Sequence, residues 1–270
     1  MIRIFLIICW ILPFCLTGNN PEKKITLHAT IQVKTPDGSW KDSLEVLQWK
    51  PEETAIIICD MWDHHWCEGA SKRVVLMAPK MNRIINSARK KGITIIHSPS
   101  ETMDFYSNYP QRKKMETAPV AKSSGKIKDW YYLDRSREPD LPVDDSDGGC
   151  DTNTQPEKFR VWTREIQALE ISGNDGISDS GKEINNFFIA HGIKNVILMG
   201  VHLNMCVLGR SFGIRGQVGL GRNVVVVSDL TDAMYNPAMS PHVDHEEGVE
   251  LILKHIEKYW CPSIESEDLL

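Results

Sequence analysis

Four short runs of apolar residues constrain the fold of this chain more than any other feature. They read AIIICD after Thr54, ITIIH from Ile93, NVILMG from Asn195 and NVVVVSD from Asn223. None alternates between apolar and polar residues, which is typical of strands buried on both faces of a parallel sheet. Segments with helical spacing lie between the runs, so the sequence predicts β-α-β units with right-handed crossovers.

Three segments have the apolar spacing of amphipathic helices. Pro79 suits the first position of one helix, Ser180 and Glu183 form a capping box at the start of another, and the third covers residues 246–260. Together with the apolar runs, these segments predict an α/β protein. Its expected architecture is a three-layer α/β/α fold built on a doubly wound, mainly parallel sheet of the Rossmann type.

Two segments fall outside this regular pattern. Residues 25–49 alternate around a Pro-Asp-Gly turn and predict a β-hairpin, so we assign 19–53 to an N-terminal hairpin extension and 54–270 to the main domain. Residues 99–157 contain many prolines and form a long insertion, which we expect to fold over one end of the sheet or to extend into solvent. A strand is predicted directly after it, at Phe159–Thr163.

The chain starts with the features of a secretory signal peptide. Arg3 precedes thirteen apolar residues from Ile4 to Leu16, a run too short to span the bilayer as a helix. We therefore assign residues 1–18 to a signal and expect a secreted or periplasmic protein with no further membrane association. Cys15 lies in a weak match to a lipoprotein box, because Phe14 stands where a small residue belongs.

Charge and cysteine content restrict the partners of the mature chain. The formal net charge of −5 provides no basic field for nucleic acid. Signal removal leaves five cysteines, and an odd number in an exported protein leaves at least one thiol unpaired. Disulfides can form among four of them, and spacing alone does not determine the pairing; these four are Cys59, Cys67, Cys150 and Cys261.

The strongest functional signal is a pair of residues at strand ends. Asp60 ends the first apolar run, and Cys206 follows the third run after a short loop. In an open doubly wound sheet, ligands bind outside the carboxyl ends of the strands at the switch point. If these two strands are neighbours, a carboxylate and a thiol meet there. Cys206 would also begin a helix, whose amides favour a thiolate and can bind an oxyanion.

Other motifs are weaker than this pair. Residues 209–213 spell G-x-S-x-G, but a nucleophile elbow must follow a strand directly, and the strand ends near Gly200. His64, His65 and Cys67 could ligate a metal, yet no second cluster has suitable spacing. We therefore predict neither a metal nor another cofactor.

The segments AIIICDMWD and GVHLNMCV resemble the corresponding motifs of the isochorismatase-like cysteine hydrolases, a family that includes nicotinamidases. The resemblance covers roughly residues 54–260. It implies an α/β/α fold, an Asp, Lys and Cys triad, and attack of the thiolate on a carbonyl carbon to give a thioester. It also implies a cis peptide bond at Val201-His202 and an oxyanion site formed by the backbone N–H groups of His202 and Cys206.

The sequence departs from the family pattern at two positions. The family lysine is expected near VWTREIQAL, where this chain has Thr163 and Arg164, so we assign Arg164 to the role of the cation. Arginine can supply a fixed positive charge but cannot exchange a proton near neutrality. The loop that carries Asp-x-His in nicotinamidases has Pro99 and Glu101 here, which disfavours a zinc-binding nicotinamidase.

Our first hypothesis is a metal-independent cysteine hydrolase that cleaves a C–N bond in a small amide, imide or carbamoyl compound. Two alternatives remain open: a non-catalytic ligand-binding or partner-binding protein of the same fold, and a vinyl-ether hydrolase that does not use the thiol as nucleophile. We expect a small-molecule substrate and a homo-oligomer, because relatives often associate. The residues assigned to substrate binding are Trp62, His64, His65, His97, Trp162 and His202.

Overall fold

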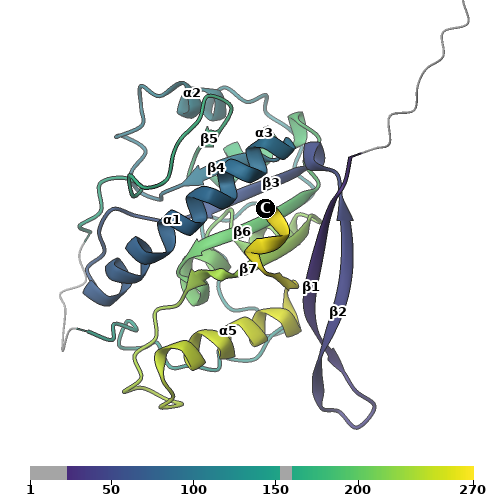
Figure 1. Ribbon diagram of the computed structural model, residues 1–270, viewed down its shortest axis with the longest axis vertical. Coiled ribbons are helices and arrows are strands. Elements are labelled where there is room, and N and C mark those ends of the chain that lie inside the picture. The colour runs from purple at the N-terminus through teal and green to yellow at the C-terminus, as the bar shows by residue number, and fades with distance from the viewer. Residues whose placement is uncertain (1–22, 153–159) are drawn as a thin grey trace, which may run out of the picture.

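The computed structural model describes residues 23–152 and 160–270. Its centre is one eight-stranded sheet with the order β2-β1-β8-β7-β6-β3-β4-β5, shown in Figure 1. The predicted signal segment, with Cys15, and Phe159 of the predicted strand lie outside the described residues. The strands are β1 Ile25–Lys34, β2 Trp40–Trp49, β3 Thr54–Cys59, β4 Thr94–Ser98, β5 Gly176–Ile177, β6 Asn195–Val201, β7 Asn223–Asp232 and β8 Ser263–Ile264.

The four apolar runs form β3, β4, β6 and β7, and adjacent strands among them pair in parallel. All residues of β3 and β6 are buried. These two strands are direct neighbours, with Cys59 opposite Gly200 at their carboxyl ends. The predicted parallel sheet is confirmed, and its switch point lies where the sequence placed it.

The predicted hairpin extends one edge of this sheet. β1 and β2 pair in antiparallel register from Ile25 opposite Trp49 to Lys34 opposite Trp40. β1 also meets β8 at Thr30 and Ser263, and β8 runs parallel to β7. The hairpin therefore belongs to the same continuous sheet as the parallel strands.

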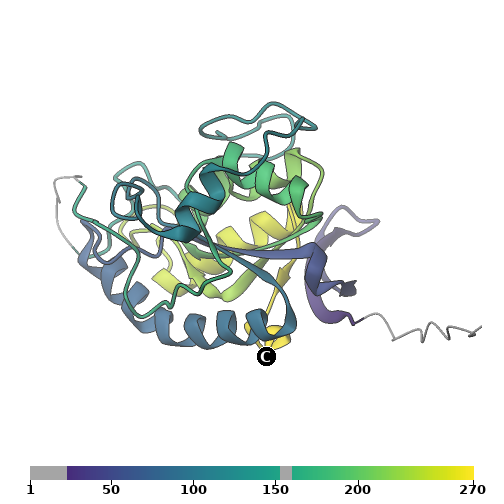
Figure 2. The same cartoon turned by 90° about the horizontal axis from the view of Figure 1, so that it is seen from above.

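Helices cover both faces of the sheet, as Figure 2 shows from above. One face packs against α1 through residues such as Val74, Met81 and Ile85. The other face packs against α3 and α5, through residues such as Phe188 and Ile252. The three-layer prediction is thus confirmed. The helices are α1 Glu68–Lys91, α2 Pro110–Glu116, α3 Gly181–Ala190, α4 Ile214–Gly219 and α5 His245–Tyr259, with short turns η1 Pro51–Glu53, η2 Leu203–Val207 and η3 Ser266–Leu269.

The structure corrects two local predictions. Pro79 lies inside α1 and does not begin it, because Val74 and Ala78 extend the same buried face toward the N-terminus and offset the lost hydrogen bond. Residues 160–163 form no strand. Instead β5 pairs with β4 at that edge of the sheet. The capping box is confirmed at one of its bonds, since Ser180 Oγ accepts a hydrogen bond from the Glu183 N–H at 3.4 Å.

Within residues 23–152 and 160–270, no helix has the length and apolar character that a membrane span requires.

Candidate active site

Asp60 occupies the first position after β3, at the centre of the sheet's carboxyl edge. Its backbone has φ 46°, a left-handed conformation that is uncommon for residues other than glycine and that is frequent at functional sites. The side chain is completely buried. Oδ1 accepts a hydrogen bond from the Ser100 N–H at 2.7 Å, so the loop after β4 fixes the orientation of the carboxyl.

Cys206 reaches the same place from β6. It lies inside η2, a π-helical turn in which the Val207 N–H donates to the carbonyl of His202 at 3.1 Å. π-turns of this kind are often found at functional sites. The Cys206 thiol lies beside the Asp60 carboxyl, close enough for each group to shift the pKa of the other, so the structure brings the two predicted residues together. The sequence predicts that Cys206 begins an α-helix. In the structure it lies within a π-turn instead.

Gly200 permits this close approach of β3 and β6. It has φ 107°, and a side chain there would overlap the backbone carbonyl of Cys59 on the neighbouring strand. Because only glycine avoids both problems, this residue allows the chain to leave β6 directly beside β3. The spacing between Asp60 and Cys206 depends on it.

The cation at the site is Arg210. Its Nε lies 3.2 Å from Asp60 Oδ2, and its positive charge also acts on the Cys206 thiol. The Arg210 N–H donates to the Cys206 carbonyl at 3.0 Å, so the two side chains lie one helical turn apart. Trp130 from the insertion covers the guanidinium, with 5.5 Å between the Arg210 Cζ and the ring centre.

Arg164, which we had assigned to this role, lies elsewhere. Its guanidinium is 5.3 Å from the centre of the Phe105 ring, and it lines a cavity of about 420 Å³ together with Phe105 and Tyr109. The backbone of Arg164 accepts a hydrogen bond from the Asp63 N–H. The sequence did contain a signal for Arg210: it follows Cys206 by four residues, the spacing that places side chains on one helical face.

The environment favours a neutral thiol in the resting site. Burial raises the pKa of the Cys206 thiol, and the negative charge of Asp60 raises it further, while Arg210 opposes both effects. Burial also raises the pKa of Asp60, against the effect of Arg210. Burial opposes the charge of Arg210, but Asp60 raises its pKa overall. This differs from our expectation of a helix-stabilised thiolate, because burial outweighs the nearby positive charge.

Aromatic rings form a wall beside these residues. Trp62, two residues after Asp60, stacks on Trp162 with 4.2 Å between ring centres. His65 stacks against Trp162 at 5.9 Å and meets the His202 ring edge-on at 4.9 Å. Burial lowers the pKa of His65 to about 4 and that of His202 to about 3. Both imidazoles are therefore neutral at physiological pH.

The other two residues assigned to substrate binding are placed differently. The His64 side chain is 75% exposed and lies 3.8 Å from Asp63. His97 is completely buried between two carboxylates, with Nδ1 2.7 Å from Glu165 Oε2 and Nε2 3.3 Å from Asp175 Oδ2. Because both ring nitrogens of His97 have partners, this side chain supports the loop architecture and offers no atom to a substrate.

The peptide bond between Val201 and His202 is cis, as the family resemblance implies. It lies directly before η2, so the backbone of His202 precedes the turn that carries Cys206.

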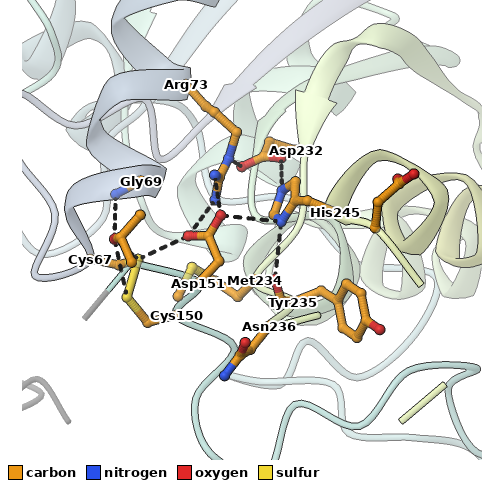
Figure 3. Close-up of polar contacts among 12 residues, drawn as sticks. Cys67, Gly69, Arg73, Cys150, Asp151, Asp232, Met234, Tyr235, Asn236 and His245 are labelled. Atoms are coloured by element: carbon orange, nitrogen blue, oxygen red, sulfur yellow. Dashed lines mark hydrogen bonds and ion pairs between the residues drawn. A yellow bond between two sulfur atoms is a disulfide. The ribbon is translucent and has the colours of Figure 1, made fainter. Parts of the chain in front are cut away.

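A disulfide and an ion network tie the insertion to α1, as Figure 3 shows. Cys67, which precedes α1, bonds to Cys150. Arg73 then contacts both Asp151 and Asp232 at 2.7 Å. The disulfide partners were left open by the sequence. Among the described residues, three thiols are free and buried: Cys59, Cys206 and Cys261.

The same corner holds the group of possible metal ligands found among the described residues, formed by Cys67, Cys150 and Asp151. The two sulfurs are bonded to each other and Asp151 is paired with Arg73. A metal ion would need deprotonated, unpaired ligands, so this group does not suit one in the disulfide form.

Comparison with known proteins supports the fold. No protein-family model and no curated protein matches the chain. Among solved structures, a cysteine hydrolase from Pseudomonas syringae pv. phaseolicola is 18% identical, with a TM-score of 0.50 over 82% of this chain and 92% of the other. This chain therefore has the fold of the isochorismatase-like hydrolases.

Two further solved structures match with lower scores. An isochorismatase from Pseudomonas putida is 14% identical, with a TM-score of 0.46 over 82% of this chain and 92% of the other. A nicotinamidase from Staphylococcus aureus is 12% identical, with a TM-score of 0.41 over 76% of this chain and 94% of the other.

Proposed function

We propose that this protein is an isochorismatase-like cysteine hydrolase that cleaves a C–N bond in a small amide, imide or carbamoyl compound. The observation that carries the proposal is the buried contact of Asp60 with both Cys206 and Arg210. The site thus combines a nucleophile, a group that can accept its proton, and a fixed cation. It lies at the carboxyl edge of a parallel sheet, where ligands bind in such folds.

The first half of the reaction forms a thioester. The Cys206 sulfur attacks the carbonyl carbon while its proton moves to Asp60, and the carbonyl oxygen becomes an oxyanion. The backbone N–H groups of His202 and Cys206 are the proposed donors to this oxygen. The C–N bond then breaks, and Asp60 returns the proton to the leaving nitrogen, so an amine or ammonia departs.

The second half restores the enzyme. Asp60 accepts a proton from water as the water oxygen attacks the thioester carbon. The C–S bond breaks, the acid product leaves, and the proton passes back to the Cys206 sulfur. The net reaction consumes one water and needs no oxidant or reductant.

Arg210 contributes charge and takes no part in proton transfer. A guanidinium stays protonated at any physiological pH, so it balances whichever of Asp60 and Cys206 carries the negative charge. Transfer of the proton between these two groups therefore moves a charge beside a fixed cation. In this scheme an arginine replaces the family lysine, and it comes from the segment that carries the nucleophile.

The aromatic wall supports a flat, polar substrate. Trp62, Trp162 and His65 present stacked rings, and such rings favour planar groups. His202 Nε2 and Trp162 Nε1 are buried with no hydrogen-bond partner among the described residues. An unpaired buried nitrogen costs about 1–3 kcal/mol, which a substrate that hydrogen-bonds to these atoms would recover.

Export and self-association remain part of the proposal. The Cys67–Cys150 disulfide supports export, because such bonds persist mainly in oxidising compartments. A homo-oligomer is expected from the resemblance to the family.

The experiment is a thioester assay on the whole mature protein. A panel of small amides, imides and carbamoyl compounds is incubated with enzyme, release of amine or ammonia is measured, and acid-quenched protein is examined by peptide mass mapping. We expect turnover with one class and a transient acyl group on Cys206. Cys206→Ser should abolish both, while the matched control Cys261→Ser, another buried thiol, should retain both.

Three outcomes would contradict the proposal. Release of amine or ammonia that persists in Cys206→Ala would show that the thiol is not the nucleophile. Turnover of a vinyl ether by both the wild type and Cys206→Ala, with none of the panel compounds cleaved, would point to vinyl-ether hydrolysis. Binding of a panel compound without turnover or acylation, in a protein with intact Cys206, would point to a non-catalytic ligand-binding protein of the same fold.

A further inference from the structure

A second polar cavity lies at the edge of the sheet opposite to Asp60 and Cys206. It has a volume of about 540 Å³, which is within the range of small-molecule sites. Lys194 precedes β6, and Arg222 and Asn223 stand at the start of β7, so these lining residues mark the amino ends of two parallel strands. The cavity is therefore separate from the candidate active site, which follows the carboxyl ends.

The walls of this cavity combine positive charge with apolar surface. Lys122, Lys194 and Arg222 line it, and no acidic residue of ranges 23–152 and 160–270 does so. The nearby carboxylate of Glu53 pairs with Lys194 at 2.7 Å. Ile189, 45% exposed, adds apolar surface to the wall.

Arg222 is the unusual member of this group. Its Nη2 donates to Asn185 Oδ1 at 2.7 Å, and its Nη1 donates to Gln217 Oε1 at 3.0 Å. Both acceptors are neutral amides, and the guanidinium also lies 5.2 Å from the centre of the Phe188 ring. Burial lowers the pKa of Arg222 to about 10, with no carboxylate to oppose it.

Other arginines of this chain show what is missing at Arg222. Five arginines whose side chains are 6–25% exposed each contact a carboxylate: Arg73, Arg89, Arg112, Arg210 and Arg215. Half-buried charges are normally paired in this way, because desolvation without a partner is costly. At Arg222 the described part of the chain supplies the neutral hydrogen bonds that orient the guanidinium and supplies no anion.

A second observation in the same wall concerns Asn185. This residue lines the cavity and is only 2% exposed, and its Nδ2 has no hydrogen-bond partner among the described residues. Arg222 thus has neutral acceptors but no carboxylate partner, and the Asn185 Nδ2 has no acceptor. A cation without an anionic partner and a donor without an acceptor, beside a cavity bordered by two lysines, are typical of an anion site whose ligand provides the missing charge and acceptor.

We infer that this cavity binds a small organic anion bearing a phosphate or sulfate group. The oxyanion would pair with Arg222 and Lys122, and the carbon part of the ligand would contact the apolar wall at Ile189. Arginine suits such groups because its planar donors match two oxygens of a tetrahedral anion. The ligand would bind away from the nucleophile, so this site is an accessory site and does not hold the substrate.

The test measures anion binding by calorimetry and thermal unfolding, with glycerol phosphate, inorganic phosphate and inorganic sulfate as probes and sodium chloride at matched ionic strength. We expect saturable binding of glycerol phosphate, tighter than that of either inorganic anion. Loss of one charge-assisted hydrogen bond should weaken the affinity about tenfold or more. We expect this weaker affinity in Arg222→Gln and in Lys122→Gln. Lys122 is exposed, so its substitution should be tolerated by the fold.

Two control variants decide where the anion binds. Lys126→Gln removes a nearby exposed lysine that does not line the cavity and should leave the affinity unchanged. Cys206→Ser should also leave it unchanged, even if the hydrolase proposal fails. The inference is overturned if chloride shifts the melting temperature as much as the phosphates do, if Lys122→Gln and Lys126→Gln have equal effects, or if Cys206→Ser removes binding.

Discussion

The Nε atom of Arg210 lies 3.2 Å from Oδ2 of Asp60, in a site where the aspartate is completely buried. Arg210 belongs to the segment that carries Cys206, and its N–H donates to the Cys206 carbonyl. The family lysine was expected on a different segment. The site of this chain is thus built from two segments. Asp60 directly follows β3, and both Cys206 and Arg210 follow β6.

Arg210→Met should therefore harm both stability and thiol chemistry. Removing one partner of a buried ion pair costs about 3–5 kcal/mol, which urea unfolding would measure. Loss of the positive charge should raise the pKa of Cys206 further and slow its alkylation. Arg164→Met is the matched control and should change both quantities little; if it has the larger effect, Arg164 is the functional cation after all.

The reactivity of Cys206 should depend steeply on pH. Because burial and Asp60 raise its pKa, the thiolate is scarce at neutral pH, and the alkylation rate should increase about tenfold per pH unit between pH 7 and 9. Mass mapping after iodoacetamide treatment should find label on Cys206 before Cys59, which is fully buried. A rate that is already constant above pH 6 would show that the resting thiol is ionised.

Gly200→Ala should disrupt the junction of β3 and β6. The added methyl group would overlap the Cys59 carbonyl, and φ 107° is strained for alanine. We expect a loss of several kcal/mol, at least about 2–3, in the free energy of unfolding, together with loss of activity. Gly192→Ala is a suitable comparison, since it shares a positive φ but has open space around it; similar losses in both variants would attribute the effect to φ alone.

The buried His97 cluster should make stability fall in mild alkali. Burial by itself opposes the charge on His97, but Glu165 and Asp175 raise its pKa to about 9. A raised pKa stabilises the folded state fully below the unfolded value of about 6.5, and this contribution is lost as pH rises toward 9. The free energy of unfolding, measured in urea, should therefore decrease from pH 6.5 to 9 with a slope approaching about 1.4 kcal/mol per pH unit. His97→Gln should lack this slope, and an equal slope in both proteins would assign it to another group.

Much of the site could be predicted from the sequence. Asp60 and Cys206 each follow an apolar run of a buried parallel strand, and the carboxyl ends of neighbouring strands meet at one edge of the sheet. Arg210 was missed because an arginine has many structural roles, and the four-residue spacing from Cys206 becomes informative only once that turn is known to be helical. The neutral state of the thiol also depends on burial, which no local pattern reports.

The start of α1 and the conformation of residues 160–163 also differ from what the local sequence predicts. Pro79 is a good helix-starting residue, yet it lies within α1 because Val74 and Ala78 bury against the sheet. Tryptophan is common in strands, but Trp162 stacks on Trp62 and forms no strand. At that edge of the sheet β5 pairs with β4 instead. Both positions were decided by partners that are distant along the chain.

The sequence by itself determined the class of fold, the parallel strands, the hairpin and the two strand-end residues of the site, because periodicity and run length are local properties. The tertiary structure alone decided which arginine faces Asp60, which cysteines pair, and that the partly buried Arg222 pairs with neutral amides. These are questions of contact between segments, and the energies of charges and thiols depend on the burial and neighbours that only the folded chain provides.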